Sequence, residues 1–129
     1  MKTQEKLCDV VILQFNEAMR RICTFFLEKR GFTEGVDFVI VGSSYELRGL
    51  MKTEGPQLLV TGIFRDGSVT LKAFIEGLRS KNPELVVVSY STENLDGSFD
   101  RVIHKTIDVQ ATLLINTVND FREGKLRRK

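Results

Sequence analysis

Apolar residues recur along the chain at two alternating spacings. Five short apolar runs predict strands, at residues 8–15, 37–41, 58–60, 85–91 and 101–106. Four segments with apolar side chains at helical spacing predict helices, at residues 16–30, 44–51, 68–81 and 108–121. Strands that alternate with helices favour a mostly parallel sheet covered on both faces.

Residues suited to helix ends stand at the boundaries of these segments. Asn16, Ser44 and Asp108 carry side-chain acceptors that can cap the first, second and last helices. Gly31 follows the first helical pattern, where glycine commonly ends a helix. In a sheet of this kind, ligands and chemistry are expected at the carboxyl ends of the strands.

Length, composition and charge agree with one ordinary domain. The chain has 129 residues, 42% hydrophobic and 28% charged, which suits a single core without disordered tracts. Its formal charge of +2 comes mainly from residues 125–129, so we assign residues 1–124 to the domain and 125–129 to a basic C-terminal tail. The tail is expected to be a solvated helix end, and nucleic acid is not an expected partner. No signal peptide or membrane segment is found, which predicts a cytoplasmic protein.

The residues that carry common catalytic chemistry are sparse. Cys8 and Cys23 lack the spacing of a zinc site and are expected to be reduced and buried, and His104 is the only histidine. There is no glycine-rich phosphate loop and no recognisable Ser-His-Asp or Cys-His arrangement. We therefore expect no enzyme activity, no metal and no cofactor.

Four stretches together are similar to the response-regulator receiver domain over nearly the whole chain. They are VVILQFNEAMRRICTFFLEKRGF at 10–32, PQLLVTGIF at 56–64, NPELVVVSYS at 82–91 and HKTIDVQATLL at 104–114. The resemblance implies a flavodoxin-like, doubly wound sheet of five parallel strands with helices on both faces. Residues 91–100, STENLDGSFD, show little helical pattern, so the family's fourth helix, between the fourth and fifth strands, is expected to be shortened or missing.

The resemblance also implies a pocket from which the acids are missing. In receivers an aspartate after the third strand accepts a phosphoryl group, and an acidic pair after the first strand holds magnesium. These positions fall here on Gly62 and on Gln14 and Phe15, none of which can do that work. The family's hydroxyl and lysine positions match Ser89 and Lys105.

Two acids near these positions are candidates for compensation. Glu17 follows the expected pair, and Asp66 lies four positions past Gly62 in the turn FRDGS. The alternative is that Asp66 has only a structural role in a turn, since Asp-Gly is common in turns. A displaced acid would also have to meet the strict geometry of phosphoryl transfer.

The preferred interpretation is a degenerate receiver, or pseudo-receiver, that signals through protein contact without aspartyl phosphate. Expected partners are a sensor kinase, another receiver or an output domain, with a homodimer as a further arrangement. One alternative is a phosphorelay receiver that uses a displaced acid such as Asp66. Another is a small-ligand-binding α/β domain with its pocket at Gly62, Ser89 and Lys105.

Overall fold

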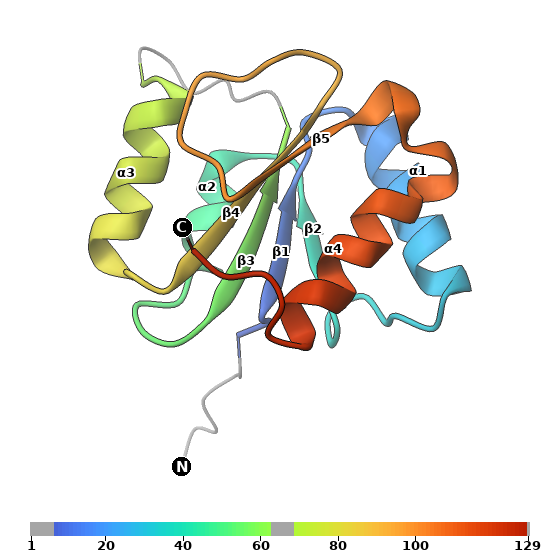
Figure 1. The fold of residues 1–129 in the computed structure, drawn as a ribbon, viewed down its shortest axis with the longest axis horizontal. Coiled ribbons are helices and arrows are strands. Elements are labelled where there is room, and N and C mark those ends of the chain that lie inside the picture. The colour runs from blue at the N-terminus through green and yellow to red at the C-terminus, as the bar shows by residue number, and fades with distance from the viewer. Residues whose placement is uncertain (1–6, 63–68, 129) are drawn as a thin grey trace.

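A single parallel sheet forms the centre of the molecule (Figure 1). The structure is a computed structural model that describes residues 7–62 and 69–128. The strands lie in the order β2-β1-β3-β4-β5, and every neighbouring pair is parallel. Their bounds are β1 Val10–Leu13, β2 Val39–Val41, β3 Gln57–Thr61, β4 Leu85–Ser91 and β5 Arg101–His104. This order confirms the expected doubly wound, flavodoxin-like architecture.

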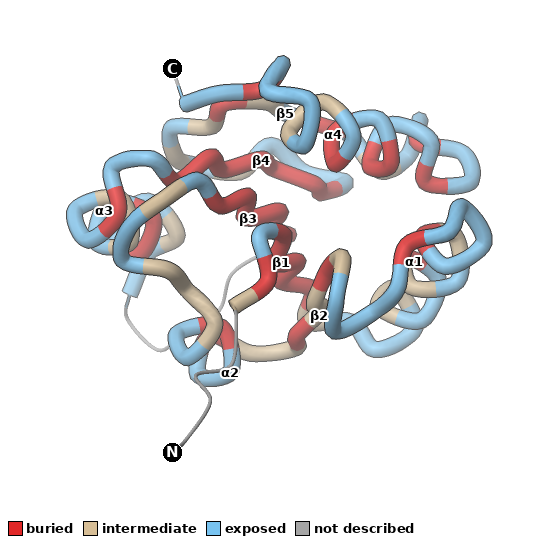
Figure 2. Tube along the Cα trace, turned by 90° about the horizontal axis from the view of Figure 1, so that it is seen from below, coloured by how far each residue is buried: buried red, intermediate tan, exposed pale blue. Residues whose placement is uncertain are grey.

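Helices cover both faces of the sheet, and the buried strands lie between them (Figure 2). Helices α1 (Glu17–Lys29) and α4 (Thr112–Arg122) pack on one face, here called the α1/α4 face. Helices α2 (Ser44–Arg48) and α3 (Leu71–Lys81) pack on the other, the α2/α3 face. Alternate residues of β1, β3 and β4 supply apolar side chains to the two cores. Within residues 7–62 and 69–128, no helix has both the length and the apolar character needed to span a membrane.

The connection from β4 to β5 contains no helix, as the polar sequence predicts. Residues 92–100, all of which the structure describes, run as an irregular loop tied to the domain by Asp100. The Asp100 carboxylate accepts hydrogen bonds from Arg79 Nη2 at 2.9 Å and from the Val87 backbone N–H at 2.8 Å. Arg79 Nη1 also donates to the Ser98 carbonyl at 2.6 Å. A buried ion pair therefore holds this loop in place of helix packing.

The predicted caps form, with one shift. Asn16 Oδ1 accepts from the Met19 N–H at 3.0 Å, which confirms the cap of α1. Gly31 has φ +92°, and the chain closes α1 with hydrogen bonds from the Gly31 and Phe32 N–H groups back to the preceding turn. The cap of α2 is Ser43 and not the predicted Ser44, because the first turn of the helix already includes Ser44.

Two 3₁₀ turns separate β5 from α4: η1 (Lys105–Ile107) and η2 (Val109–Ala111). Asp108 lies between them and is buried. It caps α4 from a distance, since its carboxylate accepts from the Leu113 N–H at 2.6 Å and the Leu114 N–H at 3.2 Å. Gln110 and Ala111 have φ of 56° and 55°, a left-handed conformation that is costly for residues with a side chain. The contacts of Asp108 hold this strained turn in place.

The basic tail is not the solvated helix end that its charge predicts. Helix α4 ends at Arg122, and Gly124, with φ +74°, reverses the chain. The Lys125 and Leu126 N–H groups donate to the Asp120 carbonyl, at 2.8 and 3.2 Å. Leu126 is consequently buried in the core of the α1/α4 face. The single apolar residue of the tail draws the chain back onto the domain, because its burial removes apolar surface from water.

Candidate functional site

The carboxyl ends of β1 and β3 bring Gln14 and Gly62 together. The Gln14 N–H donates to the Val41 carbonyl and the Gly62 N–H to the Leu13 carbonyl, each at 3.0 Å, so the sheet ladder extends one residue past these strands. Gln14 Oε1 accepts from the Asn16 N–H at 3.3 Å, which leaves Nε2 directed toward Gly62. A Cβ atom added at Gly62 would lie 3.1 Å from Gln14 Nε2 and 3.4 Å from the Tyr90 carbonyl oxygen. A neutral amide therefore occupies the space beside Gly62.

A guanidinium, which the sequence pattern places on the outer face of the first helix, covers the loop after β1. Arg20 Nη1 donates to the carbonyls of Gln14 at 2.8 Å and of Phe15 at 3.0 Å. A Cβ atom at Gly42 would lie only 2.6 Å from that same nitrogen, so the glycine leaves room for Arg20. The loop after β1, where the resemblance to receivers predicted the position of an acidic pair, is thus covered by a cation. A positive charge at this point disfavours a bound divalent cation.

Of the two candidate compensating acids, the structure describes one. Glu17 lies in the exposed first turn of α1, where its carboxylate pairs with Arg21 Nη2 at 2.7 Å. It therefore belongs to a surface ion pair of the helix. Asp66 lies outside the described residues. Within those residues, no group of three or more His, Cys, Asp or Glu side chains could hold a metal ion.

Ser89 lies near Gly62 in the sheet but on the opposite face. It pairs with Thr61 in the register of β3 and β4, two residues before β4 ends. Val87 faces α2 and α3, whereas Tyr90 faces α1 and α4, so the alternation along β4 places Ser89 on the α2/α3 face. Gln14 and Gly62 follow Ile12 and Val60 by two residues and share the α1/α4 face. The Ser89 hydroxyl is buried, with no hydrogen-bond partner among residues 7–62 and 69–128.

Lys105 follows β5 immediately and begins η1 instead of ending the strand. Its Nζ lies 5.7 Å from the centroid of the Tyr90 ring, a cation–π contact. Within the described part of the chain, no carboxylate forms an ion pair with it. Burial lowers the pKa of Lys105, against an opposing effect of the nearby Cys23. The amine therefore lies on the α1/α4 face, against the Tyr90 ring.

A hydrogen bond between Tyr90 and Asp108 completes this region and escaped the sequence analysis. The Tyr90 hydroxyl donates to Asp108 Oδ2 at 2.7 Å, and both residues are buried. Burial, and then this bond, raise the pKa of Tyr90 well above its ordinary value. Burial also raises the pKa of Cys23 to about 11, against a lowering effect of Lys105. The thiol therefore stays protonated at neutral pH and is a poor nucleophile.

These side chains define a region with donors and a cation but little nucleophilic capacity. The structure brings Gln14, Gly62 and the Tyr90 backbone into contact and places Lys105 over the Tyr90 ring. It separates Ser89 from them by the thickness of the sheet. No local sequence pattern predicts the Tyr90–Asp108 bond, because it joins residues 18 positions apart in the chain.

Comparisons with known proteins leave this geometry as the basis for function. No protein-family model and no curated protein sequence matches the chain.

Proposed function

We propose that the chain is a degenerate receiver domain that acts in signal transduction through protein–protein contact and without aspartyl phosphate. The observation that carries this proposal is that Gln14 Nε2 lies 3.1 Å from the position that a Cβ atom on residue 62 would take. A phosphoacceptor carboxylate would need that space and a divalent cation beside it. The structure has a neutral amide in the first position and Arg20 over the neighbouring loop.

The region from β5 to α4 supports binding to a protein partner. Without a helix between β4 and β5, the side chain of Val102 on edge strand β5 is 52% exposed on the α2/α3 side. Ile107 in η1 and Val109 in η2 are 68% and 73% exposed. Apolar side chains left uncovered on consecutive elements are typical of interaction surfaces. The proposed partner is a sensor kinase, a receiver or an output domain of the same signalling system, with a second copy of the chain as the other arrangement.

One experiment separates contact signalling from phosphorylation. The purified chain is incubated with acetyl phosphate and magnesium, beside an intact receiver as the positive control, and analysed by intact-mass spectrometry. We expect no phosphoryl adduct on the chain. An adduct on any aspartate, Asp66 included, would instead support the displaced-acid alternative.

The binding of the chain to purified kinase and receiver domains of the same signalling system is then measured. We expect Val109→Glu to weaken binding, because it places a charge on the proposed surface. Val36→Glu is the matched control, since Val36 is 72% exposed in the loop before β2, outside that surface. Equal binding by both variants would contradict the assignment of the surface, and partner binding only after acetyl phosphate treatment would contradict the proposed function.

A further inference from the structure

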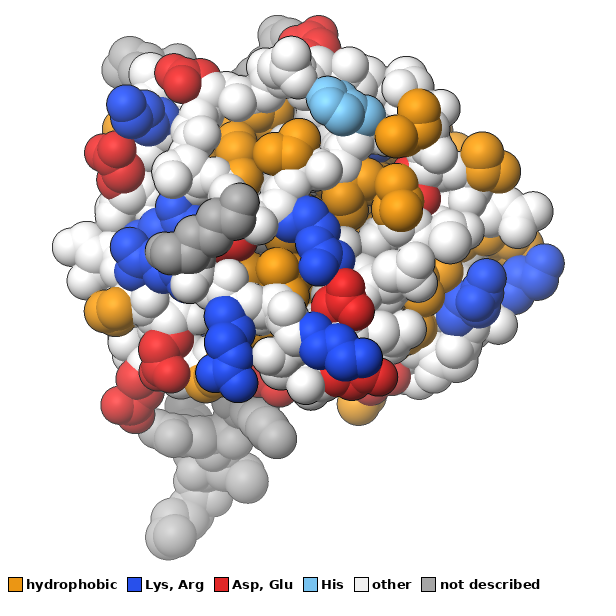
Figure 3. Space-filling view, viewed as in Figure 1, with side chains coloured by type: hydrophobic (Ala, Val, Ile, Leu, Met, Phe, Trp, Pro, Cys, Tyr) orange, Lys and Arg blue, Asp and Glu red, His pale blue; other side chains and the backbone are white. Residues whose placement is uncertain are grey.

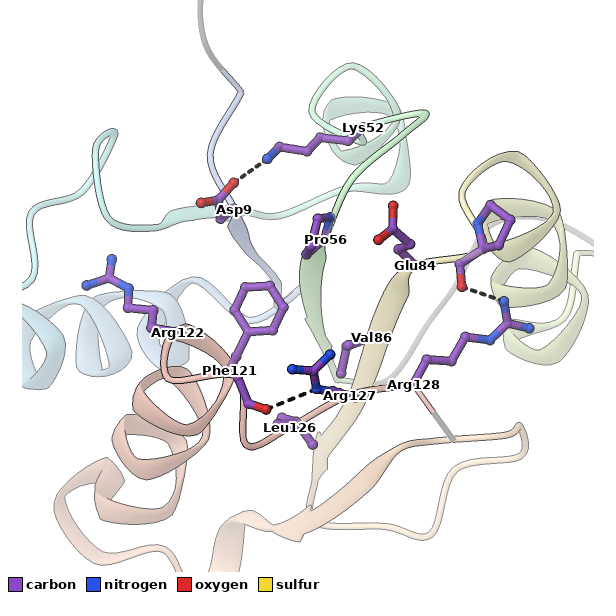
Figure 4. A pocket seen from close by; sticks show the side chains of 12 residues that line it. Asp9, Lys52, Pro56, Glu84, Val86, Phe121, Arg122, Leu126, Arg127 and Arg128 are labelled. Carbon is purple, nitrogen blue, oxygen red and sulfur yellow. Dashed lines mark hydrogen bonds and ion pairs between the residues drawn. The ribbon is translucent and has the colours of Figure 1, made fainter.

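A cavity of about 810 Å³ opens at the amino ends of the strands, at the other end of the sheet from the candidate site (Figure 4). It lies where three strands begin, because Asp9 precedes β1, Pro56 precedes β3 and Glu84 precedes β4. Its other wall is formed by the end of α4, by Gly124, and by Leu126, Arg127 and Arg128 of the tail. The volume falls within the range of pockets that bind small molecules.

The cavity has an apolar wall, to which the folded tail contributes Leu126. Leu126 is buried in the core, and Phe121 and Val86 line the wall beside it. The hydrogen bonds of the Lys125 and Leu126 N–H groups to the Asp120 carbonyl fix the turn that positions Leu126. An apolar group placed here would leave water and contact Phe121 and Leu126, which stabilises binding.

The cavity also has an excess of cations. Its lining includes four cations, Lys52, Arg122, Arg127 and Arg128, and two acids, Asp9 and Glu84. Figure 3 shows Lys and Arg side chains interspersed with acids over the face drawn there. Two of the lining cations already have acidic partners: Lys52 pairs with Asp9, and Arg122 pairs with Asp37 at 3.0 Å. Their charges are largely compensated.

Arg127 and Arg128 have no such compensation within the described residues. Arg127 Nε donates to the Gly124 carbonyl at 3.1 Å, and Arg128 Nη1 donates to the Pro83 carbonyl at 2.8 Å. A guanidinium has five N–H donors, so each of these hydrogen bonds anchors its side chain and leaves four donors for other acceptors. Both arginines line the cavity from adjacent positions on the tail (Figure 4).

Glu84 is the one lining acid with no cationic partner among the described residues. Its Oε2 accepts from the Gly55 N–H at 3.0 Å, which holds the carboxylate toward the loop before β3. The lining therefore contains two guanidinium groups without an acidic partner and one carboxylate without a cationic partner, among the described residues. The remaining charge favours an anion, and the planar donor pattern of arginine matches phosphate and carboxylate oxygens.

We propose that this cavity binds a small organic anion, in which a phosphate or carboxylate group contacts Arg127 and Arg128 and an apolar, ring-sized body packs on Phe121 and Leu126. This proposal does not depend on the signalling role, because the cavity lies at the amino ends of the strands, whereas Gln14 and Gly62 lie at the carboxyl ends. It assigns to the tail a binding function that its sequence, as a run of basic residues, does not specify.

The test uses phenyl phosphate and benzoate as probes of the full chain, with affinity and location measured by NMR titration. Inorganic phosphate tests the charge alone, and benzyl alcohol tests the ring alone. We expect at least one aromatic anion to bind more tightly than either half, with shifts in residues 121–128. Whichever anion binds more tightly identifies the ligand group.

Variants of the tail decide the roles of the arginines. Arg127→Ala and Arg128→Ala should each weaken binding about tenfold, the effect of losing one charge-assisted contact. Lys125→Ala is the matched control, because Lys125 carries the same charge on the same tail, outside the lining, and pairs with Glu123 at 3.0 Å. If Arg128→Ala loosens the tail by removing its contact with Pro83, Arg127→Ala decides the question, since it leaves that contact in place.

Four results would overturn the proposal. These are no binding of either aromatic anion at millimolar concentration, inorganic phosphate binding as tightly as phenyl phosphate, equal weakening by Lys125→Ala, and shifts centred on Lys105 instead of the tail.

Discussion

Replacing Gly62 with aspartate is the most direct test of the proposal that this region cannot be phosphorylated. The new Cβ atom would lie 3.1 Å from Gln14 Nε2 and 3.4 Å from the Tyr90 carbonyl oxygen, closer than most Cβ contacts. Gln14 is only 6% exposed, and the Asn16 N–H holds its Oε1, so the side chain has little freedom to move away. The substitution therefore introduces both overpacking and a carboxylate at a buried position.

The size of the effect follows from two contributions. Overpacking by one methyl group costs about 1–3 kcal/mol, and restriction of the unfolded chain offsets about 0.4–1 kcal/mol of that. Gly62→Ala should thus lower the free energy of unfolding by about 1 kcal/mol. Gly62→Asp should lower it by about 2–4 kcal/mol, since its carboxylate also lies beside the Tyr90 carbonyl without full solvation.

The assay combines urea denaturation with intact-mass spectrometry after treatment with acetyl phosphate and magnesium. Gly62→Ala isolates the contact without the charge, and an intact receiver shows that the phosphoryl donor is active. We expect Gly62→Asp to remain unlabelled, because Gln14 and Phe15 supply no acid for a metal. A stable Gly62→Asp variant that carries a phosphoryl group on residue 62 would refute the reasoning.

The remaining predictions concern buried polar contacts. The folded-state pKa of Tyr90 is raised, so the unfolded chain loses the tyrosine proton first and the wild-type protein becomes less stable above about pH 10. Tyr90→Phe should remove this loss of stability, which thermal melts from pH 8 to 11 would measure. Equal alkaline sensitivity in both proteins would contradict this. Asp108→Ala should cost about 2–4 kcal/mol in urea denaturation, because it removes the cap of α4 and the partner of Tyr90, whereas a cost below about 1 kcal/mol would contradict the cap. Asp100→Ala should cost about 3–5 kcal/mol by leaving Arg79 buried and unpaired. Glu17→Ala, at an exposed ion pair, should cost less than about 1 kcal/mol, and similar costs for these two would argue against burial as the cause.

Much of the fold could be predicted from local patterns. Within residues 7–62 and 69–128, apolar spacing located the five strands and four α-helices that the structure has, although the strand predicted at residues 101–106 ends at His104 and the second helix ends at Arg48. Asn16, Gly31 and Asp108 act at the helix ends where their residue types predicted a role. These signals are local because a cap or a helical stripe depends on residues within a few positions.

The candidate site was less predictable because its geometry depends on sheet faces and chain reversals. The run LVVV before Ser89 is apolar on both faces, so it contains no alternation from which the face of Ser89 could be inferred. Helical spacing places Arg20 on the polar side of α1, yet its long side chain turns back over the loop after β1. The charges of the tail suggested a solvated end, and the burial of Leu126 reverses that outcome.

The sequence by itself determined the alternation of strands and helices and the absence of acids at positions 14, 15 and 62, since both depend only on which residue stands where. Only the tertiary structure decided that Ser89 lies apart from Gly62, that Lys105 lies against the Tyr90 ring, and that the tail lines a cavity with more cations than acids. The physical reason is that packing joins residues distant in the chain, and the choice among such contacts depends on the total surface buried and the charges compensated.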